Sequence, residues 1–256
     1  MPEPTCRRLA RAALLIGAFF AATAHAVVAD TAREARWADE VVPQLVVGDA
    51  VWLATARHPR VLALYTEPAK ATRNAVIVVH GLGVHPDWNL IGVLRSTLAD
   101  LGFATLSVQM PVLAADAPRD DYPALFPDAS ERLAAATAWL RARGYRNVGV
   151  VSHSMGSAMV NAWLARSGWA GVDAWVSVGM FVPFDAAPRM PVLDVVAERD
   201  FPEVLAQARM RGAALRADDC SGSRVVSGAD HYFEDSAARL AAAVAPFLER
   251  ALTGRC

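Results

Sequence analysis

The chain has 256 residues, of which 54% are hydrophobic and 20% are charged. This hydrophobic content excludes an intrinsically disordered protein, and the length supports one large domain or two small ones with a sizeable core. Lys and Arg number 25 against 26 Asp and Glu, so the formal net charge is −1. Because positive charge is not in excess, the composition argues against a nucleic-acid partner.

The first 26 residues have the pattern of a cleavable secretory signal. Arginines at positions 7, 8 and 11 precede an apolar run from Ala12 to Ala24, and Ala24-His25-Ala26 offers small residues to a signal peptidase. We expect residues 1–26 to be removed, which leaves a periplasmic or secreted protein without a stable membrane anchor. The alternative is an uncleaved anchor, because apolar residues continue to position 29 and could just cross a bilayer.

Two cysteines, Cys220 and Cys256, remain once the signal has been removed. An even number of cysteines in an exported chain is typical of a disulfide, so we expect these two to pair. The alternative is two free thiols, because Cys256 is the last residue and chain ends are often poorly ordered.

Residues 27–256 are expected to form a single α/β domain. Strand-like runs at 50–54 and 61–65 flank a turn with His58 and Pro59, which predicts an opening hairpin. Strands and helices then alternate, with strands expected at 75–79, 103–108, 148–151, 174–178, 192–196 and 224–226. The alternation predicts a mostly parallel sheet with helices on both faces, and functional residues at the carboxyl ends of the strands.

A segment rich in proline, Pro111 to Pro127, separates the second of these parallel strands from the helix that follows it. It contains four prolines, so it is expected not to be helical throughout. Asp128 and Ser130 are expected to cap the helix after it.

Ser154 lies between a predicted strand and a predicted helix, in Val151-Ser152-His153-Ser154-Met155-Gly156. A nucleophile on a sharp strand-to-helix turn projects its hydroxyl above the sheet, and bulky residues two positions away would collide with neighbouring elements. The segment resembles the nucleophile elbow of the α/β-hydrolase superfamily, with Ser152 in place of the usual first glycine. The alternative is a helix start at which Ser154 only caps the first turn.

The resemblance implies a catalytic base and acid in the chain order serine, acid, histidine. His231 is the only histidine after Ser154, so it is the expected base. Nine acidic residues lie between the two: Asp173, Asp185, Asp194, Glu198, Asp200, Glu203, Asp218, Asp219 and Asp230. The family's acid usually follows a strand in a Leu-x-Val-x-Ala-x-x-Asp context, which implies Asp200, with Glu198 on the same loop as the runner-up.

The resemblance also implies an oxyanion hole. His80-Gly81-Leu82-Gly83 looks like the family's His-Gly motif and implies the backbone N–H of Leu82 as one donor, while Met155 supplies the other because it follows the nucleophile. A metal cluster of His80, His85 and Asp87 is disfavoured, since no second ligand group with comparable spacing appears.

His153, beside the nucleophile, is expected to be a packing residue whose side chain points away from the site. Met155, Met159 and Trp163 recur at helical spacing and are expected to belong to the core.

The resemblance covers the chain from about residue 60 to its end. It implies hydrolysis of an acyl bond, in the first place a carboxylic ester, through a covalent acyl-enzyme and without a metal or organic cofactor. Residues 181–189 are too few to build a lid, which is typical of a small, lidless, secreted bacterial branch. The pocket walls must then come from short loops, and the apolar candidates are Leu82, Trp88, Tyr122, Phe126 and Phe181.

Two other functions compete with an esterase. One is a non-catalytic relative that binds a ligand or protein of the cell envelope, because a fold does not determine a function. The presence of all three triad residue types favours a catalyst over such a binder. The other is a peptidase or amidase, which the motifs do not exclude.

Overall fold

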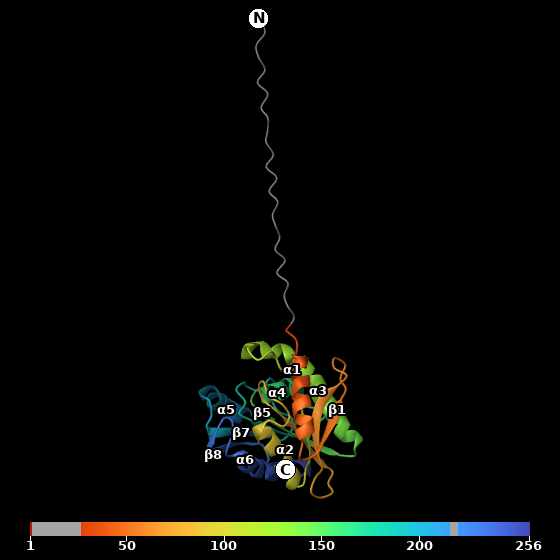
Figure 1. The fold of residues 1–256 in the computed structure, drawn as a ribbon. Helices are drawn as coiled ribbons and strands as arrows, with labels where there is room; N and C mark the ends of the chain where they lie inside the picture. Colours follow the sequence, from red (N-terminus) through yellow and green to blue (C-terminus); the bar gives the residue numbers. More distant parts are fainter. Residues whose placement is uncertain (2–26, 216–219) are drawn as a thin grey trace.

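A computed structural model describes residues 1, 27–215 and 220–256 (Figure 1). The predicted secretory signal lies outside the described residues, so export stays a prediction. Asp218 and Asp219, two of the nine candidate acids, also lie outside them.

The centre of the domain is an eight-stranded sheet in the order β1-β2-β4-β3-β5-β6-β7-β8. The opening hairpin pairs β1 with β2, and β2 runs antiparallel to β4. All other neighbours are parallel, which confirms the predicted mostly parallel sheet. The strands are β1 (Asp49–Leu53), β2 (Val61–Thr66), β3 (Asn74–Val79), β4 (Ala104–Val108), β5 (Asn147–His153), β6 (Ala174–Val178), β7 (Val192–Arg199) and β8 (Gly222–Asp230).

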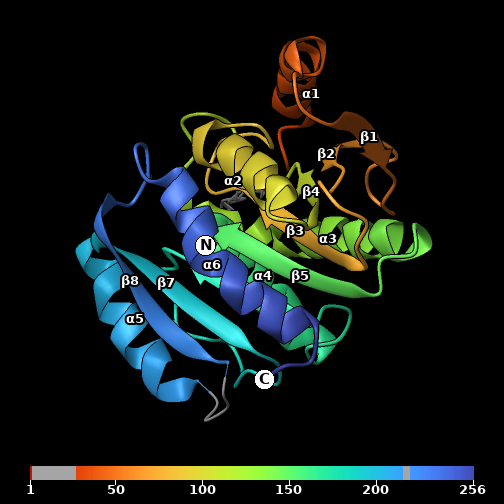
Figure 2. The same cartoon turned by 90° about the horizontal axis from the view of Figure 1, so that it is seen from below.

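Helices cover both faces of the sheet (Figure 2). α2 (Asn89–Asp100) and α6 (Ala237–Leu252) pack together on one face, and α3 (Phe126–Ala142) and α4 (Met155–Ser167) pack together on the other. The central strand β3 is apolar on both sides because it is covered twice: Val76 and Val78 face α2 and α6, whereas Ile77 and Val79 face α3 and α4.

Two helices lie nearer the ends of the sheet. α5 (Pro202–Ala214) packs on β7 and β8. α1 (Thr31–Val41) and a short 3-10 helix, η1 (Val42–Gln44), precede the hairpin, and the buried Ala38 of α1 packs against Leu62 and Leu64 of β2.

The helix after the proline-rich segment begins earlier than expected. The 3-10 helix η2 (Arg119–Leu125) leads directly into α3, whose first turn accepts Pro127 because an N–H at that position needs no partner. The prediction that Asp128 and Ser130 cap this helix is wrong. Asp128 pairs with the buried Arg132 one turn later, and the Ser130 hydroxyl donates to the carbonyl of Phe126.

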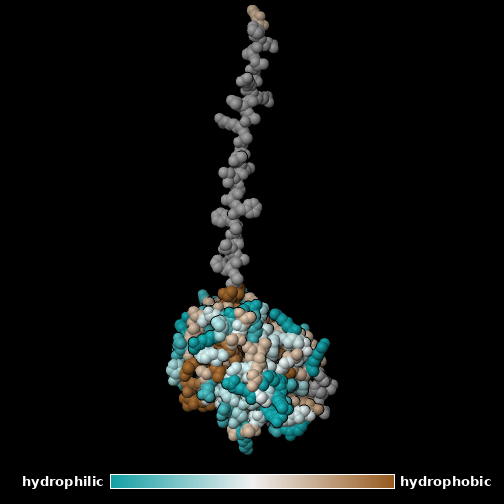
Figure 3. Space-filling model, turned by 90° about the vertical axis from the view of Figure 1, so that its right-hand side faces the viewer, coloured by the Kyte–Doolittle hydropathy of each residue, from teal (hydrophilic) through white to brown (hydrophobic). Residues whose placement is uncertain are grey.

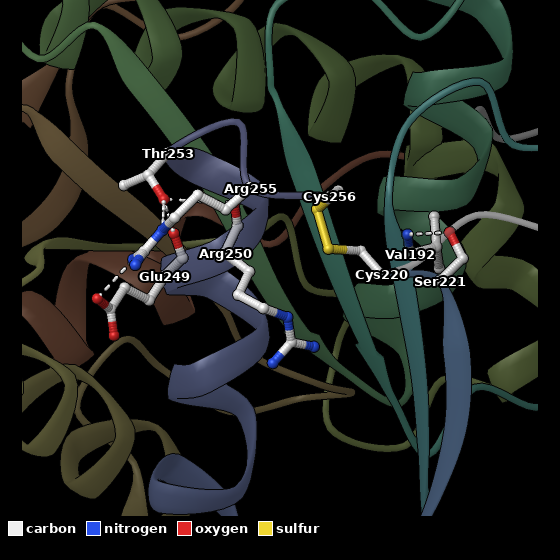
Figure 4. The surroundings of a disulfide bond; sticks show 8 residues. All are labelled: Val192, Cys220, Ser221, Glu249, Arg250, Thr253, Arg255 and Cys256. Atoms are coloured by element: carbon white, nitrogen blue, oxygen red, sulfur yellow. Dashed lines mark hydrogen bonds and ion pairs between the residues drawn. A yellow bond between two sulfur atoms is a disulfide. The ribbon is translucent and has the colours of Figure 1, made fainter.

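A disulfide joins Cys220, just before β8, to Cys256 at the end of the chain, with 5.3 Å between their Cα atoms (Figure 4). Beside it, the hydroxyl oxygen of Ser221 accepts a hydrogen bond from the N–H of Val192 at the start of β7. The bridge therefore ties the segment after α6 to the edge of the sheet at which β7 and β8 begin.

The described surface of the domain is mixed in polarity. The face drawn in Figure 3 is mostly hydrophilic or neutral, with hydrophobic surface at its lower left and a separate, smaller patch at the top of the domain. Among the helices of residues 27–215 and 220–256, none has the length and hydrophobicity that a membrane span requires.

Candidate active site

Ser154 occupies the turn between β5 and α4. Its φ of 52° and ψ of −119° lie in a region that residues with a side chain rarely adopt, and such strain is typical of functional turns. The N–H of Ser154 donates to the carbonyl of Val178 at 2.8 Å, which ties the turn to the end of β6. The Ser154 side chain makes no capping hydrogen bond to α4, so the simple helix-cap alternative is wrong.

Small neighbours make this turn possible. A Cβ atom on Gly156 would lie 2.2 Å from the carbonyl oxygen of His80, so the first turn of α4 packs directly against the end of β3. Ser152, which replaces the usual glycine, is held in a buried polar network: its hydroxyl oxygen lies 3.0 Å from that of Ser157 and accepts from the indole N–H of Trp175 at 2.8 Å.

The structure brings the three predicted triad residues together. His231 Nε2 lies 3.0 Å from Ser154 Oγ, and His231 Nδ1 lies 2.6 Å from Asp200 Oδ1. The runner-up, Glu198, faces the edge of the sheet instead, where its carboxylate accepts from the N–H of Gly228. Asp194 is buried and paired with Arg211.

The environment of Asp200 favours its ionised form. Burial raises the pKa of this carboxyl, but the hydrogen bond and charge interaction with His231, together with the N–H groups of Ala197 and Phe201, outweigh burial and leave the pKa below its ordinary value. An ionised Asp200 keeps the proton of the neutral imidazole on Nδ1. His231 Nε2 is then free to accept the hydroxyl proton of Ser154.

Gly179, which no sequence motif indicated, makes room for the imidazole. Its φ is 60°, and a Cβ atom there would lie 3.1 Å from His231 Cε1. The backbone that leaves β6 therefore packs directly against the His231 ring.

His153 is a packing residue, as expected, but the expectation that it points away from the site is wrong. Its buried ring lies 4.9 Å from the ring of His231, and its Nε2 lies 2.9 Å from the backbone carbonyl oxygen of His231. Burial, followed by the nearby His231, lowers the pKa of His153 to about 4. The neutral ring therefore donates Nε2–H to the loop that carries His231.

The loop after β3 passes over Ser154. A Cβ atom on Gly81 would lie 3.3 Å from Ser154 Cβ. The buried His80 accepts at Nε2 from the N–H of Met110, so its proton is on Nδ1, which donates to the carbonyl of Gly81. Because this carbonyl and the N–H of Leu82 belong to one trans peptide group, they point in opposite directions, and His80 thereby sets the direction of the Leu82 N–H.

Met155 is the first residue of α4, where an N–H has no acceptor within the helix. The N–H groups of Leu82 and Met155 thus belong to the two backbone segments that flank the Ser154 hydroxyl. His80, one residue of the disfavoured metal cluster, forms hydrogen bonds within the protein through both ring nitrogens. The described part of the chain contains no group of three or more His, Cys, Asp or Glu side chains placed to hold a metal ion.

A cavity of about 220 Å³ opens beside Ser154. Of the predicted wall residues, Leu82, Trp88 and Phe181 line it. Tyr122 does not: it is buried in the core, and its hydroxyl oxygen accepts from the N–H of Leu113. Phe126 lines a neighbouring cavity, which shares Met155 and Phe181 with the first.

Further residues of the cavity were not predicted. Phe201, which follows Asp200, and Tyr232, which follows His231, are exposed at its rim, and the Phe201 ring lies 4.5 Å from the His231 ring. Arg119 lies over the Phe181 ring and pairs with Glu203 at 2.8 Å. Phe201 and Tyr232 each directly follow a predicted triad residue and line the cavity. Their position next to the triad in the sequence is a signal that could have identified them as wall residues.

Many solved structures are similar to this chain, among them the following three. An α/β serine hydrolase homologue from Coxiella burnetii has a TM-score of 0.64 and 16% identity, with 79% of this chain and 98% of that chain covered. A dienelactone hydrolase from Anabaena variabilis has a TM-score of 0.63 and 21% identity, with 79% and 97% covered. A serine hydrolase without a lid from Xanthomonas campestris has a TM-score of 0.61 and 15% identity, with 81% and 96% covered. The chain has the α/β-hydrolase fold.

The connection from β6 to β7 is where a helical lid would be expected in the α/β-hydrolase fold. Residues 179–191 are all described and contain no helix. A family model described as a protein of unknown function (DUF3530) matches residues 12–131, which include the loop after β3 and end before Ser154. No curated protein matches the chain in sequence.

Proposed function

We propose that the chain is an exported serine hydrolase that cleaves carboxylic esters through a covalent acyl-enzyme on Ser154. The observation that carries this proposal is the continuous hydrogen-bonded chain from Ser154 Oγ through His231 to Asp200, with distances of 3.0 Å and 2.6 Å, at the mouth of an open cavity. A serine hydroxyl needs such a base to become a nucleophile.

In the proposed reaction, Ser154 Oγ attacks the ester carbonyl carbon while its proton moves to His231 Nε2. The carbonyl oxygen becomes an oxyanion that accepts hydrogen bonds from the N–H groups of Leu82 and Met155, and Asp200 stabilises the imidazolium. His231 then gives its proton to the departing alkoxide. A water molecule, deprotonated by His231, attacks the acyl-enzyme, and the proton returns to Ser154 as the carboxylic acid leaves.

The cavity supports esters with small or medium acyl groups as substrates. Its walls are apolar near Ser154, formed by Leu82, Trp88 and Phe181, and it opens to solvent without a helical lid. The names of similar structures support ester hydrolysis: one is an esterase domain from Rhodothermus marinus, and another is Est1E from Butyrivibrio proteoclasticus with ferulic acid bound.

Export to the periplasm or medium is part of the proposal. It rests on the arginine-flanked apolar run and Ala24-His25-Ala26 at the start of the chain. The bond between Cys220 and Cys256 supports it, because structural disulfides persist in oxidising compartments. The sequence of the mature N-terminus tests it: a protein that begins at Val27 is expected, whereas an intact Met1 on a membrane-bound form would contradict it.

Labelling with a fluorophosphonate probe tests the catalytic role. The purified protein should form one covalent adduct on Ser154, Ser154→Ala should form none, and Ser167→Ala, which changes an exposed serine at the end of α4, should label normally. A folded wild-type protein that does not label would favour the non-catalytic binder. Labelling together with turnover of peptides but not of esters would favour the peptidase or amidase.

A further inference from the structure

The N-terminal helix α1 is docked on loops at the carboxyl edge of the sheet by the residues of its first turn. The N–H of Asp30 donates to the carbonyl of Val112 at 2.7 Å, and Asp30 Oδ1 caps the helix by accepting from the N–H of Arg33. The Glu34 carboxylate accepts from the N–H of Val112 and pairs with the fully buried Arg132 at 2.9 Å. These contacts fix the position of α1 at its N-terminal end.

Arg33 extends from this fixed helix to two separate loops. Its Nη2 donates to the carbonyl of Gly83 at 3.0 Å, and its Nη1 donates to the carbonyl of Leu113 at 2.8 Å. The guanidinium also lies 4.5 Å from the ring centroid of Trp37, one helical turn further along. A planar guanidinium held by stacking donates in fixed directions, so Arg33 forms a rigid bridge between the loop after β3 and the loop after β4.

Gly83 directly follows Leu82, whose N–H is the proposed oxyanion donor. Its φ of 67° is a left-handed conformation that reverses the loop at this point. The carbonyl of Gly81 is held by His80 from inside the sheet, and the carbonyl of Gly83 is held by Arg33 from α1. His80 therefore holds the peptide group that carries the Leu82 N–H through its own carbonyl, and Arg33 holds the loop again two residues later, at the carbonyl of Gly83.

We propose that Arg33 of α1 is a positioning residue for the oxyanion hole: it holds the loop so that the Leu82 N–H meets the oxyanion at the correct place. This inference rests on the proposed function. Arg33 binds backbone carbonyls and not the reacting atoms, so it acts through Leu82. Its effect belongs to the transition state, because the oxyanion forms only as Ser154 attacks, and a displacement of about 1 Å can cost about 10²-fold in rate.

The experiment compares Arg33→Ala and Arg33→Lys with Arg36→Ala, a matched control that removes an exposed arginine of the same helix. We expect Arg33→Ala to lower kcat on p-nitrophenyl butyrate by about tenfold, less than the loss of a whole oxyanion donor, with KM changed less than twofold. Arg33→Lys keeps the charge but cannot bridge both carbonyls, so its kcat should lie between that of Arg33→Ala and that of the wild type. Arg36→Ala should match the wild type.

An arylboronic acid provides a second readout, because it forms a tetrahedral adduct on a catalytic serine. Its inhibition constant should rise in Arg33→Ala by about the same factor as kcat falls. The melting temperature of the variant should show that it is folded. Unchanged kcat and unchanged boronate affinity in both Arg33 variants would overturn the inference and leave α1 a purely structural helix. Failure of the proposed function looks different, because the wild type itself would then neither label with fluorophosphonate nor hydrolyse the ester.

Discussion

Nε2 of His153 lies 2.9 Å from the backbone carbonyl oxygen of His231, so the residue before Ser154 supports the loop that carries His231. The two rings also lie 4.9 Å apart. Ser154 and His231 are therefore linked twice, once by the contact between their side chains and once through the His153 side chain and the backbone carbonyl of His231. This second link gives a first prediction.

His153→Phe should keep the packing but remove the hydrogen bond to the carbonyl of His231. A hydrogen bond of this kind contributes about 1 kcal/mol, which corresponds to about a fivefold change in rate. We therefore expect kcat on a p-nitrophenyl ester to fall about fivefold, while fluorophosphonate still labels Ser154. An unchanged kcat would show that the loop is held in place without His153.

Asp200→Asn should leave the fold intact and lower kcat by about 10³–10⁴-fold, because the amide no longer holds the imidazole in the reactive tautomer. The matched control is Glu198→Gln near the end of β7, whose carboxylate accepts from the N–H of Gly228 and has no hydrogen bond to His231. Steady-state kinetics of both variants tests the assignment. High activity in Asp200→Asn with loss in Glu198→Gln would transfer the role to Glu198.

The buried histidines predict that stability falls in mild acid. Burial lowers the pKa of His80 to about 3 and that of His153 to about 4, both from 6.5. Between pH 6.5 and these values the unfolded chain binds protons that the folded protein does not, so the free energy of unfolding decreases as the pH falls through this window. At pH 4.5 each histidine is expected to cost up to about 3 kcal/mol.

Urea unfolding at several pH values measures this effect. The slope of the unfolding free energy against pH, between pH 4.5 and 6, measures how many protons are taken up on unfolding. This number should be smaller by about one in His153→Phe, because that variant has one fewer buried histidine to protonate. The difference between the two proteins isolates His153 from carboxyl groups that titrate in the same range. Equal slopes would mean that His153 is not held neutral in the folded protein.

The disulfide is predicted to stabilise the domain without affecting catalysis. Cys220 and Cys256 close a loop with a sequence separation of 36, for which chain entropy predicts about 3–4 kcal/mol. Cys220→Ser with Cys256→Ser should lower the free energy of unfolding by about this amount. Because the bridge lies near the start of β8 and His231 follows the end of β8, kcat measured on the folded variant at low temperature should match the wild type. A large loss of kcat would show that the bridge also shapes the site.

The absence of a helix from residues 179–191 predicts how activity depends on acyl chain length. Short-chain aryl esters should have a higher kcat/KM than emulsified long-chain triglycerides, with no rate jump when the substrate forms micelles, since no lid has to open at an interface. A rate series across the critical micelle concentration tests this. A sharp rise at that concentration would contradict an open site.

The sequence predicted the parallel sheet and the residues at the ends of its strands because both follow from local patterns. Ser154, Asp200 and His231 each stand just beyond a strand, and parallel strands bring their carboxyl ends to one edge. The pocket walls could not be predicted in the same way. Tyr122 and Phe126 are aromatic residues near that edge. Tyr122 lies in η2 and is buried in the core, whereas Phe126 begins α3 and lines the neighbouring cavity.

Sequence patterns also could not predict contacts between segments that are far apart in the sequence. Arg33 lies 50 residues from Gly83 and 80 from Leu113, and no periodicity links an arginine on an N-terminal helix to two backbone carbonyls. His153 is 78 residues from His231 and was expected to point away from it. In both cases the partner is a backbone oxygen, which every residue has, so residue identity gives no signal.

Mass spectrometry can detect the acyl-enzyme that we propose on Ser154. The wild-type protein is mixed with excess p-nitrophenyl butyrate, quenched in acid during the first turnovers and digested, with Ser154→Ala treated in parallel. We predict one butyryl group on the peptide that contains Ser154, formed at the rate of a stoichiometric burst of p-nitrophenol, and none in Ser154→Ala. Ester turnover that persists in Ser154→Ala, or a butyryl group on another residue during turnover, would show that Ser154 is not the nucleophile.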